Sequence, residues 1–598
     1  KGDFGKAFER SCQGKTEEMK LRWIKALTHV ANIEGEHYLN WANEADMIQK
    51  IATDVSKKLN VTLSSDFDDM VGLQTHLRKV NSLLCLEHDD DVKMIGIWGP
   101  AGIGKTTLAR ALFNQLSSDF RLRCFMGNLR GGSYRSILGV DDYGSKLCLQ
   151  NHLLSNILNQ RGMRVDHLGA IKEWLHDQRV LIILDDVDDL EQLEVLAKER
   201  FWFGYGSLII VTTQDKKIIK AHGIEDIYHM GFPSRTDALA MLCLAAFKRS
   251  SVPDGFEEVA SRVAKLCGNL PLGLSVVGSS LRGESKDEWE VQVSRIESSL
   301  DRKIEDVLRV GYDRLVKKDQ DLFLHIACIF NIYCNVGYMR SMLGDSNLDV
   351  ENGLKTLAVK SLVQISDYPH SNYSNQYIVI NSLLVQMGRQ VVHQQSDEPG
   401  KRQFLVDAKE IRDVLANKTG TGSVIGISLD MSQVGDFSIS GRAFEGMPNL
   451  RFLRIIQRSR LQLRISEDME YLPRLRLLDW WYYPRKRLPP NFQPECLVKL
   501  CMACSDLKKL WDGIQPLPNL KTINLDDSRE LKEIPNLSEA TNLDTLSLIG
   551  CTSLVELPSS IRNLHKLKHL KMRNCVKLRV IPTNINLASL EDVDMSHC

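Results

Sequence analysis

A short glycine-rich stretch has the residue types and the spacing that bind phosphate. Residues 99–106 read GPAGIGKT, which fits the pattern G-x-x-x-x-G-K-[ST]. Glycine permits positive φ angles, so consecutive backbone N–H groups of such a loop can point at one anion. The glycines that carry this expectation are Gly99, Gly102 and Gly104.

Two polar side chains complete this phosphate-binding motif. Lys105 is expected to reach the β- and γ-phosphates of a nucleotide, and the hydroxyl of Thr106 is expected to bind Mg²⁺. A β-branched run ends before the loop at Trp98, and apolar residues recur at helical spacing from Leu108 onward. A strand, a loop and a helix in this order favour a nucleotide site over a glycine turn without a ligand.

Carboxylates follow a second apolar run, as a magnesium-dependent nucleotide site requires. Val180 to Leu184 form a predicted buried strand that ends at Asp185 and Asp186. We expect Asp185 to hold Mg²⁺ through water and Asp186 to polarise the water that attacks the γ-phosphate. Asp186 is therefore the predicted catalytic residue, although an Asp-Asp pair by itself also suits an ordinary solvated turn.

These motifs need a sheet that brings the ends of several strands together. Further apolar runs at 124–130 and 207–215 alternate with helical stretches, which predicts a parallel α/β sheet covered by helices. Thr212 and Thr213 end the last of these runs, so we expect them on the γ-phosphate side of the site.

A mostly helical segment follows the predicted sheet. Within residues 267–281, Pro271 suits either a contact with a planar ring such as adenine or the first turn of a helix. Strand character at 377–380 and an apolar helix face from Leu383 to Val391 indicate a winged helix. This segment has no basic stripe, so we expect no direct contact with nucleic acid.

The C-terminal third of the chain is repetitive. The pattern L-x-x-L-x-L starts at intervals of 25, 22, 23, 23, 24 and 23 residues, which is the period of leucine-rich repeats. Residues between the leucines should line a concave surface. Charge bands there, such as Asp526 and Asp527 facing Lys568 and Lys571, suit either a protein partner or plain solvation. The repeats start at Leu450, Leu475, Leu497, Leu520, Leu543, Leu567 and Leu590.

Composition narrows the classes of function. The 598 residues include 76 basic and 76 acidic ones, so no net charge attracts nucleic acid or an anionic membrane. No apolar run approaches the roughly 18 residues of a transmembrane segment, and no secretory signal is evident. The 14 scattered cysteines favour reduced thiols in a cytoplasmic or nuclear protein. Because the chain starts at Lys1 and Cys598 lies inside a repeat, we expect a fragment of a longer protein.

The order of the motifs identifies a family. The chain contains, one after another, GDFGKAFERSCQGKTEEMKLRWIKAL, DMVGL, GPAGIGKTT, LIILDDVD, IIVTTQD, GNLPLGL and FLHIACIF. This series resembles plant disease-resistance proteins of the Toll/interleukin-receptor (TIR), nucleotide-binding (NB-ARC), leucine-rich-repeat class. The resemblance covers residues 1–598, and the order is more specific than any single motif.

The resemblance implies a multidomain α/β protein with a P-loop NTPase sheet, helical and winged-helix subdomains and a leucine-rich-repeat solenoid. The implied order is a TIR remnant with its linker, the nucleotide-binding domain, helical ARC1, winged-helix ARC2, a connector with a first repeat-like strand, and truncated repeats. The expected boundaries are 1–45, 46–230, 231–300, 301–395, 396–445 and 446–598.

The resemblance also implies which residues bind ADP or ATP with Mg²⁺. Val71 and Pro271 would contact adenine, and Thr212 would lie near the γ-phosphate. Thr106 and Asp185 would be the metal ligands, with Asp186 beside them. The phosphates would contact Gly104, Lys105, Thr106 and Thr107.

Two positions depart from the family pattern. Gln214 stands where many relatives have Arg, which argues against a cationic γ-phosphate sensor at this position. Asn381, within INS at 380–382, replaces the His that contacts the ADP phosphate in the family. Either Asn381 makes that contact with a shorter, uncharged donor, or Asn381 or Ser382 caps the helix that begins near Leu383.

The resemblance implies an intracellular plant immune receptor that works as a switch. ADP would hold the resting form, and a pathogen effector or guarded host protein on the repeats would favour opening. ATP would then hold the open form for self-assembly, and slow hydrolysis would reset it. The alternatives are a constitutive ATPase, marked by rapid turnover, and a scaffold with a vestigial site, marked by purification without nucleotide. TIR domains of the family cleave NAD⁺, but the catalytic Glu would precede Lys1, so we expect no such activity here.

Overall fold

The computed structural model describes most of the chain from residue 70 onward. The described residues are 12, 16, 19–21, 23–24, 67, 70–84, 91–127, 129, 142–160, 164–298, 300–331, 334–367, 376–457, 463–583 and 589–598. The predicted TIR remnant and linker at 1–45 lie almost entirely outside these residues. None of the helices within this described part is long and apolar enough to cross a membrane.

A five-stranded parallel sheet forms the first folded unit, which we call the nucleotide unit (residues 70–230). Its strand order is β2-β3-β4-β1-β5, and each neighbouring pair is parallel. The sequence analysis missed the edge strand β5, because only one of its four residues is buried and no apolar run marks it. The strands are β1 (Lys93–Trp98), β2 (Leu122–Met126), β3 (Val180–Val187), β4 (Leu208–Thr213) and β5 (Asp226–His229).

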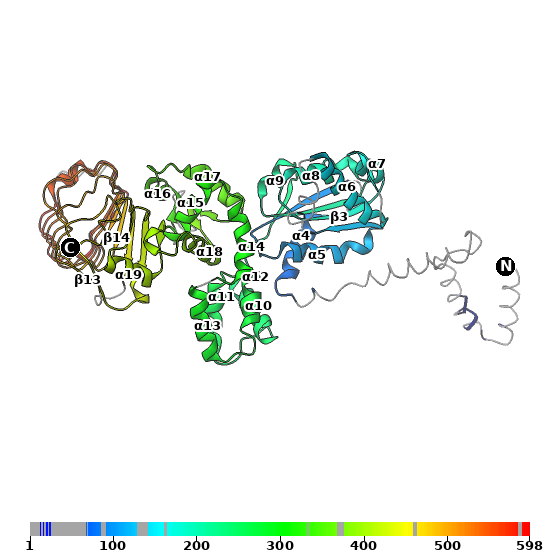
Figure 1. The fold of residues 1–598 in the computed structure, drawn as a ribbon, viewed down its shortest axis with the longest axis horizontal. Coiled ribbons are helices and arrows are strands. Elements are labelled where there is room, and N and C mark those ends of the chain that lie inside the picture. Colours follow the sequence, from blue (N-terminus) through cyan, green and yellow to red (C-terminus); the bar gives the residue numbers. More distant parts are fainter. Residues whose placement is uncertain are drawn as a thin grey trace.

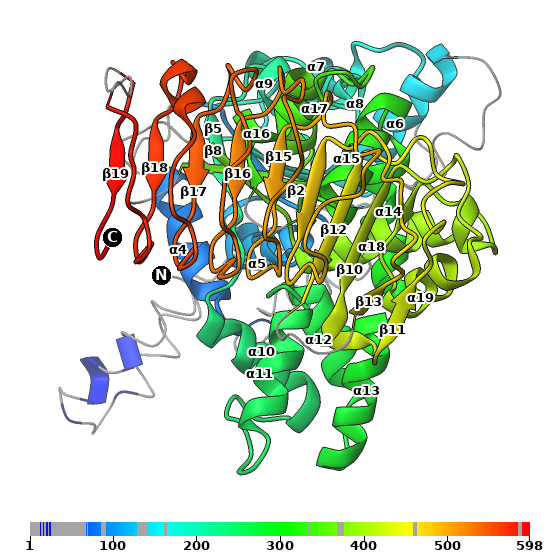
Figure 2. The same cartoon turned by 90° about the vertical axis from the view of Figure 1, so that its left-hand side faces the viewer.

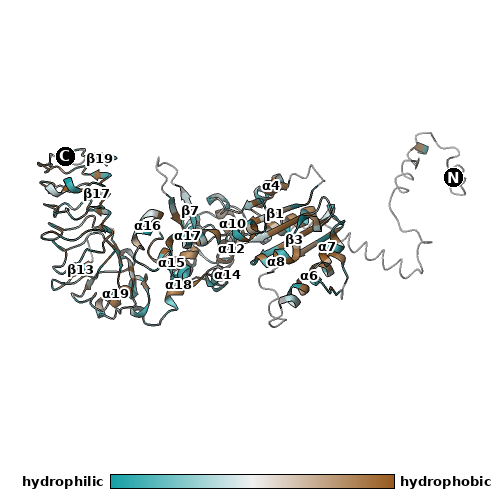
Figure 3. Cartoon of the chain, turned by 90° about the horizontal axis from the view of Figure 1, so that it is seen from above, coloured by the Kyte–Doolittle hydropathy of each residue, from teal (hydrophilic) through white to brown (hydrophobic). Residues whose placement is uncertain are grey.

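Continuous apolar runs explain why helices cover both faces of this sheet. All six residues of β4 and all but one of the eight residues of β3 are buried, as is typical of parallel strands between helical layers. Figure 3 shows β1 and β3 in hydrophobic colours at the centre of the unit. The helices are α4 (Leu73–Leu84), α5 (Lys105–Leu116), α6 (Asp142–Leu158), α7 (Ala170–Leu175), α8 (Leu190–Ala197) and α9 (Lys216–Ala221).

A helical unit (residues 231–298) and a winged-helix unit (residues 301–396) follow. The winged-helix sheet has the order β6-β8-β7 with antiparallel pairs, which agrees with the predicted winged helix. The helical unit contains α10 (Arg235–Phe247), α11 (Glu257–Leu266), α12 (Pro271–Ser280) and α13 (Lys286–Ser298). The winged-helix unit contains α14 (Arg302–Asp313), α15 (Lys317–Cys328), β6 (Cys334–Asn335), α16 (Val336–Met342), α17 (Val350–Val359), β7 (Gln364–Asp367), β8 (Gln376–Val379) and α18 (Ser382–His393).

Nine parallel strands form a C-terminal solenoid (residues 404–598), and Figure 2 shows them side by side in chain order. Leu500, Ile523 and Leu546 occupy one register position on successive strands and are fully buried. One apolar stack therefore joins the repeats. The strands are β9 (Phe404–Leu405), β10 (Gly426–Asp430), β12 (Phe452–Ile456), β14 (Leu477–Trp480), β15 (Lys499–Cys501), β16 (Thr522–Asn524), β17 (Thr545–Ser547), β18 (His569–Lys571) and β19 (Asp592–Asp594). Helix α19 (Ala408–Asn417) and a separate parallel pair, β11 (Phe437–Ile439) with β13 (Leu463–Ile465), accompany them.

The winged-helix unit lies between the nucleotide unit and the solenoid, as Figure 1 shows. Basic side chains on or just before β12, β14 and β16 bind the winged-helix unit to the solenoid. Arg454 donates to the carbonyl oxygen of Ile329 at 2.7 Å, and Arg476 donates to that of Ser341 at 2.7 Å. Lys521 donates to the Ser341 hydroxyl at 2.5 Å. The surface of the solenoid that carries these side chains therefore contacts the winged-helix unit of the same chain.

Asp526 contacts the neighbouring repeat of the solenoid. Its carboxylate accepts hydrogen bonds from Ser547 Oγ at 2.6 Å and from the backbone N–H of Ile549 at 2.9 Å. Lys568 pairs with Glu591 at 2.7 Å. Asp526 thus stabilises the adjoining turn, and the sequence alone could not locate this backbone donor.

We predict that Asp526→Ala destabilises the solenoid by about 1 to 3 kcal/mol, because the Ile549 N–H and the Ser547 hydroxyl lose their acceptor. Calorimetric unfolding of the variant measures this loss. Glu530→Ala, at an exposed position nearby, is the control and should change the free energy of unfolding by less than about 0.5 kcal/mol. Equal effects of the two substitutions would contradict the role of Asp526.

Candidate nucleotide-binding site

A cavity of about 1090 Å³ lies at the carboxyl ends of the central strands of the nucleotide unit. Ligands of open parallel α/β sheets bind at this edge. Three units contribute to its wall. The nucleotide unit provides the 101–107 loop and the strand ends, the helical unit provides Pro271, Leu272 and Ser275 from α12, and the winged-helix unit provides Val307 and Arg314. A ligand in this cavity can therefore contact all three units.

The loop before α5 has the backbone geometry of an anion site. Gly102 and Gly104 have φ angles of 73° and 105°, which side chains rarely permit. A Cβ at Gly102 would also lie 2.9 Å from Cβ of Leu272. Gly104 is the N-cap of the 12-residue helix α5 and has no side-chain cap. The first N–H groups and the positive end of α5 therefore face the cavity that an anion would enter.

Lys105 is buried within this wall, with 7% of its surface exposed. Its ammonium donates to the carbonyl oxygens of Gly99 and Pro100, both at 2.9 Å. These neutral acceptors hold the charge beside the loop without cancelling it. The loop thus combines backbone donors with one buried cation, the combination that phosphate recognition requires.

A buried carboxylate joins three elements next to Lys105. Asp185 Oδ1, at the end of β3, accepts from Thr106 Oγ1 of α5 at 3.1 Å and from Thr212 Oγ1 of β4 at 2.7 Å. Burial raises the pKa of the Asp185 carboxyl above its ordinary value, and the bonds from Thr212 and Thr106 counteract this rise. The two hydroxyls therefore favour the charged carboxylate that a cation needs.

This oxygen set fits Mg²⁺. Magnesium prefers carboxylate and hydroxyl oxygens, keeps several waters, and is held by one or two protein groups together with substrate phosphates. Thr106 Oγ1 and Asp185 Oδ1 lie close enough to share one ion. Across the described residues no cluster of three or more His, Cys, Asp or Glu side chains forms a metal cage, and a nucleotide-bound Mg²⁺ does not need one.

Asp186 lines the cavity directly. Its φ of 59° is uncommon for a side chain other than glycine, and its N–H donates to Thr212 Oγ1 at 2.8 Å. That bond fixes the irregular last residues of β3, where the pairing with β4 shifts register. Strained backbone of this kind persists where surrounding structure enforces it, often at functional sites.

The structure brings most of the predicted contacts to one cavity. Gly99 and Asp185 support the lining residues from behind, through their bonds to Lys105 and Thr106. The predicted residues that line the cavity are Val71, Gly102, Gly104, Lys105, Thr106, Thr107, Asp186, Thr212 and Pro271. Pro271 also opens α12 at its first turn, which confirms the helix-entry interpretation, while its contact with adenine stays a prediction.

Sequence reasoning missed several residues that line the cavity. Met70, Met230, Pro233 and Met241 enlarge its apolar wall, which suits the ring of a nucleotide base. Met230 follows the missed strand β5, and its N–H donates to the Trp98 carbonyl at 2.8 Å. The isolated methionines form no motif, so only the folded arrangement reveals them.

Asn381 lies away from the cavity in which its nucleotide contact was expected. It lies in a second cavity of about 650 Å³ between the helical and winged-helix units. Its Oδ1 accepts from the Leu383 N–H at 2.9 Å as the N-cap of α18, and its Nδ2 donates to Gly268 O at 2.9 Å. The capping alternative is therefore confirmed. Asn381 lines this second cavity and is not among the residues that line the large one.

We predict that Asn381→Ala lowers the free energy of unfolding by about 0.5 to 2 kcal/mol, because α18 loses its cap. Asn381→Ser, which retains a capping hydroxyl, should lose less. Thermal unfolding of both variants gives the stabilities, and calorimetric titration gives the ADP affinity. The cap role requires an unchanged ADP affinity, whereas a tenfold loss, about 1.4 kcal/mol, would favour the nucleotide contact.

Comparison with known families adds three matches along the chain. Residues 1–73 match the TIR domain, and residues 73–252 match the NB-ARC domain. Residues 316–396 match the winged-helix domain described as Disease resistance protein Roq1-like. These matches lie within residues 1–396, so the leucine-rich-repeat assignment depends on the sequence period and on the strand geometry of the solenoid.

Relatives from Arabidopsis thaliana match the whole chain. Disease resistance protein RML1A is 52% identical over 600 residues, which cover 100% of this chain and 59% of the relative. Disease resistance protein RPS6 is 46% identical over 607 residues, covering 100% of this chain and 53% of the relative. The chain thus spans a little over half the length of these relatives. It belongs to the family of disease resistance proteins that join TIR, NB-ARC and Roq1-like winged-helix domains.

Proposed function

We propose that this chain is the nucleotide-dependent switch of an intracellular plant immune receptor, which ADP holds at rest and ATP holds in the active form. The observation that carries the proposal is the shared wall of the large cavity. Residues of the nucleotide, helical and winged-helix units all line it. A nucleotide bound there contacts three units at once, so its differential contacts can set their arrangement.

In this proposal each part of the site has one task. The loop N–H groups and Lys105 bind the β- and γ-phosphates, and the apolar wall around Val71 and Pro271 holds adenine. Thr106 and Asp185 hold Mg²⁺, which neutralises charge on the phosphates when it is bound. Asp186 orients and polarises the attacking water, so hydrolysis is a slow reset and not the purpose of the protein.

We further propose that the solenoid recognises a pathogen effector or a guarded host protein in the cytoplasm or nucleus, and that activated copies self-assemble. The names of the relatives support a role in disease resistance. The contacts of Arg454, Arg476 and Lys521 with the winged-helix unit give the solenoid a direct route to the switch. A partner that competes for this surface would loosen that connection.

The nucleotide itself tests the proposal. Mass spectrometry of the small molecules released from purified protein should detect ADP or ATP. Lys105→Ala should remove this signal, since losing a hydrogen bond to a charged group costs about 1.5 to 3 kcal/mol, or roughly 10- to 150-fold in affinity. Lys198→Ala, an exposed lysine of the same unit outside the cavity, should retain it. Release of no nucleotide from either protein would refute the switch.

Hydrolysis should depend on Asp186 more than binding does. Asp186→Asn keeps the size of the side chain but removes the charge, so we expect ATP hydrolysis to slow by about 10²-fold or more, with nearly unchanged ATP binding. Asp185→Asn should instead weaken the Mg²⁺-dependent part of binding. Single-turnover hydrolysis and titration with and without Mg²⁺ separate the two roles. Hydrolysis at the parent rate by Asp186→Asn would disprove its catalytic role.

A further inference from the structure

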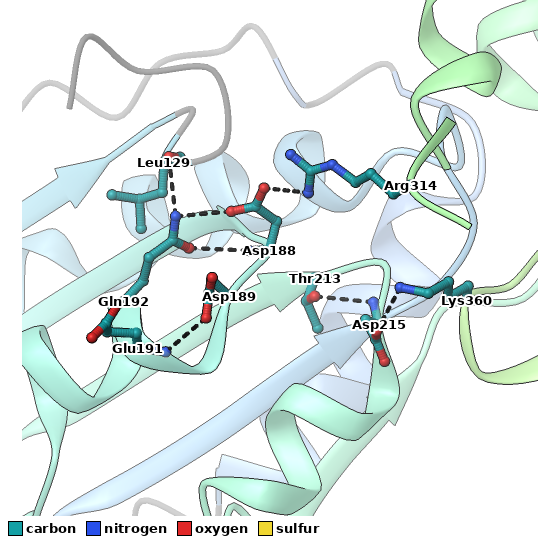
Figure 4. A network of polar contacts seen from close by, with 9 residues as sticks. All are labelled: Leu129, Asp188, Asp189, Glu191, Gln192, Thr213, Asp215, Arg314 and Lys360. Atoms are coloured by element: carbon teal, nitrogen blue, oxygen red, sulfur yellow. Dashed lines mark hydrogen bonds and ion pairs between the residues drawn. The ribbon is translucent and has the colours of Figure 1, made fainter. Parts of the chain in front are cut away.

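A small hollow connects the γ-phosphate side of the nucleotide cavity with the winged-helix unit. It has a volume of about 60 Å³, and Asp186, Asp188, Gln214, Arg314 and Lys360 contribute to its lining. Asp186, Gln214 and Arg314 line the large cavity as well. Figure 4 shows Arg314 and Lys360 reaching across this junction towards the carboxylates that follow β3 and β4.

Arg314 is the cation of this junction that the nucleotide cavity shares. It follows α14 as its C-cap and forms an ion pair with Asp188. The Arg314 side chain is 36% exposed and the Asp188 side chain 9% exposed. The anchoring acid is therefore the less exposed partner, whereas the long guanidinium side chain keeps room to turn.

Asp188 is held in place by its own neighbours. Gln192 Nε2 donates to Asp188 Oδ1 at 2.8 Å and to the Leu129 carbonyl at 3.3 Å, and Gln192 Oε1 accepts from the Asp188 N–H at 3.0 Å. These bonds fix the carboxylate of Asp188 independently of Arg314. Its negative charge therefore remains at the junction whichever partner the guanidinium contacts.

The strand end beside this pair lacks its own cation. Gln214 follows the two threonines of β4. Its side chain lies beside Gly311 of α14: a Cβ added to that glycine would stand 3.9 Å from Gln214 Oε1. A neutral amide there cannot balance a terminal phosphate that sits next to Asp186 and Asp185. A positive group on this side, in addition to Lys105 and Mg²⁺ on the loop side, would offset the repulsion between that phosphate and the two carboxylates.

The other cations that line the large cavity lie outside the lining of this hollow, including Lys105, which would approach the phosphates from the loop side. Lys105 is held by the carbonyls of the 99–100 turn, and Arg282 donates to the Ala245 carbonyl at 2.9 Å within the helical unit. Of the cations that line the large cavity in the described part of the chain, Arg314 is the one that also lines the hollow beside Asp186 and Gln214.

We propose that Arg314 recognises the terminal phosphate of ATP and exchanges or shares its ion pair with Asp188 to do so. This inference depends on the proposed nucleotide switch and names its ATP-selective residue. A guanidinium has five N–H donors in a planar fork, so it can bind a phosphate bidentately and keep a donor for a carboxylate. ADP lacks the phosphate that would reach Arg314 and leaves the ion pair with Asp188 intact. The winged-helix unit, which the switch must move, thereby contacts the γ-phosphate directly through Arg314.

The test compares the affinity for ADP with that for the non-hydrolysable β,γ-imido analogue of ATP, both with Mg²⁺, by calorimetric titration of the full chain. Arg314→Gln should weaken binding of the analogue by about 10-fold or more, as expected for a lost hydrogen bond to a charged group, and leave ADP within about twofold. Arg314→Lys, which keeps the charge without the fork, should recover part of the loss. Asp188→Asn should raise the preference for the analogue, because it frees the guanidinium.

Lys360→Gln is the matched control. Lys360 forms an ion pair with Asp215 across the same junction at 3.0 Å but does not line the large cavity. The Lys360→Gln variant should change the affinities for ADP and for the ATP analogue by the same factor or not at all. An unchanged ratio of affinities in Arg314→Gln, while the parent binds both nucleotides, would overturn the role of Arg314 alone. A parent protein that binds neither nucleotide would overturn the proposed switch and this inference together.

Discussion

One buried carboxylate determines the geometry of the nucleotide site. Asp185 accepts hydrogen bonds from Thr106 and Thr212, so the end of β3, the first turn of α5 and the end of β4 meet at a single oxygen. A buried carboxylate is costly unless donors satisfy it. The same oxygens that reduce this cost are those that suit Mg²⁺. The local fold and the metal chemistry therefore impose the same requirement on these three residues.

Short motifs could be predicted because their physics is local. The glycines of the 99–106 loop and the apolar run before Asp185 act through backbone freedom and strand burial, which sequence displays directly. Strand β5 was missed because three of its four residues are not buried. Asn381 illustrates another limit, since a favourable N-cap is a local property but the position of Gly268 O, which Asn381 also binds, depends on packing between units.

Arg314 was invisible in the sequence for a related reason. It follows an amphipathic helix in a stretch with several other basic residues, and nothing in the pattern separates it from a solvated lysine or arginine. Its significance comes from the meeting of α14 with the turn after β3. Contacts between units that lie far apart in the chain are set by tertiary packing. A residue that binds a ligand of one unit from a second unit is therefore the hardest to predict.

The contacts between units also differ in strength, and this difference decides where the structure can open. The helical and winged-helix units pack through the helix pairs α12 with α14 and α11 with α18, and Asn381 and Ser382 bond to the carbonyls of Gly268 and Leu266. The nucleotide unit meets the winged-helix unit through Trp98 Nε1, which donates to the Val359 carbonyl at 3.1 Å, and through the ion pairs of Arg314 and Lys360.

Ion pairs with substantial solvent access contribute only about 0 to 1 kcal/mol each, because solvent screens them and ordering the side chains costs entropy. Packed helix pairs bury apolar surface at about 25 cal/mol per Å² and are not screened. The junction between the nucleotide and winged-helix units should therefore yield before the packed helices that join the helical and winged-helix units. A phosphate charge placed at that junction acts on its weakest contact, which is where a small difference between ADP and ATP can have the largest effect.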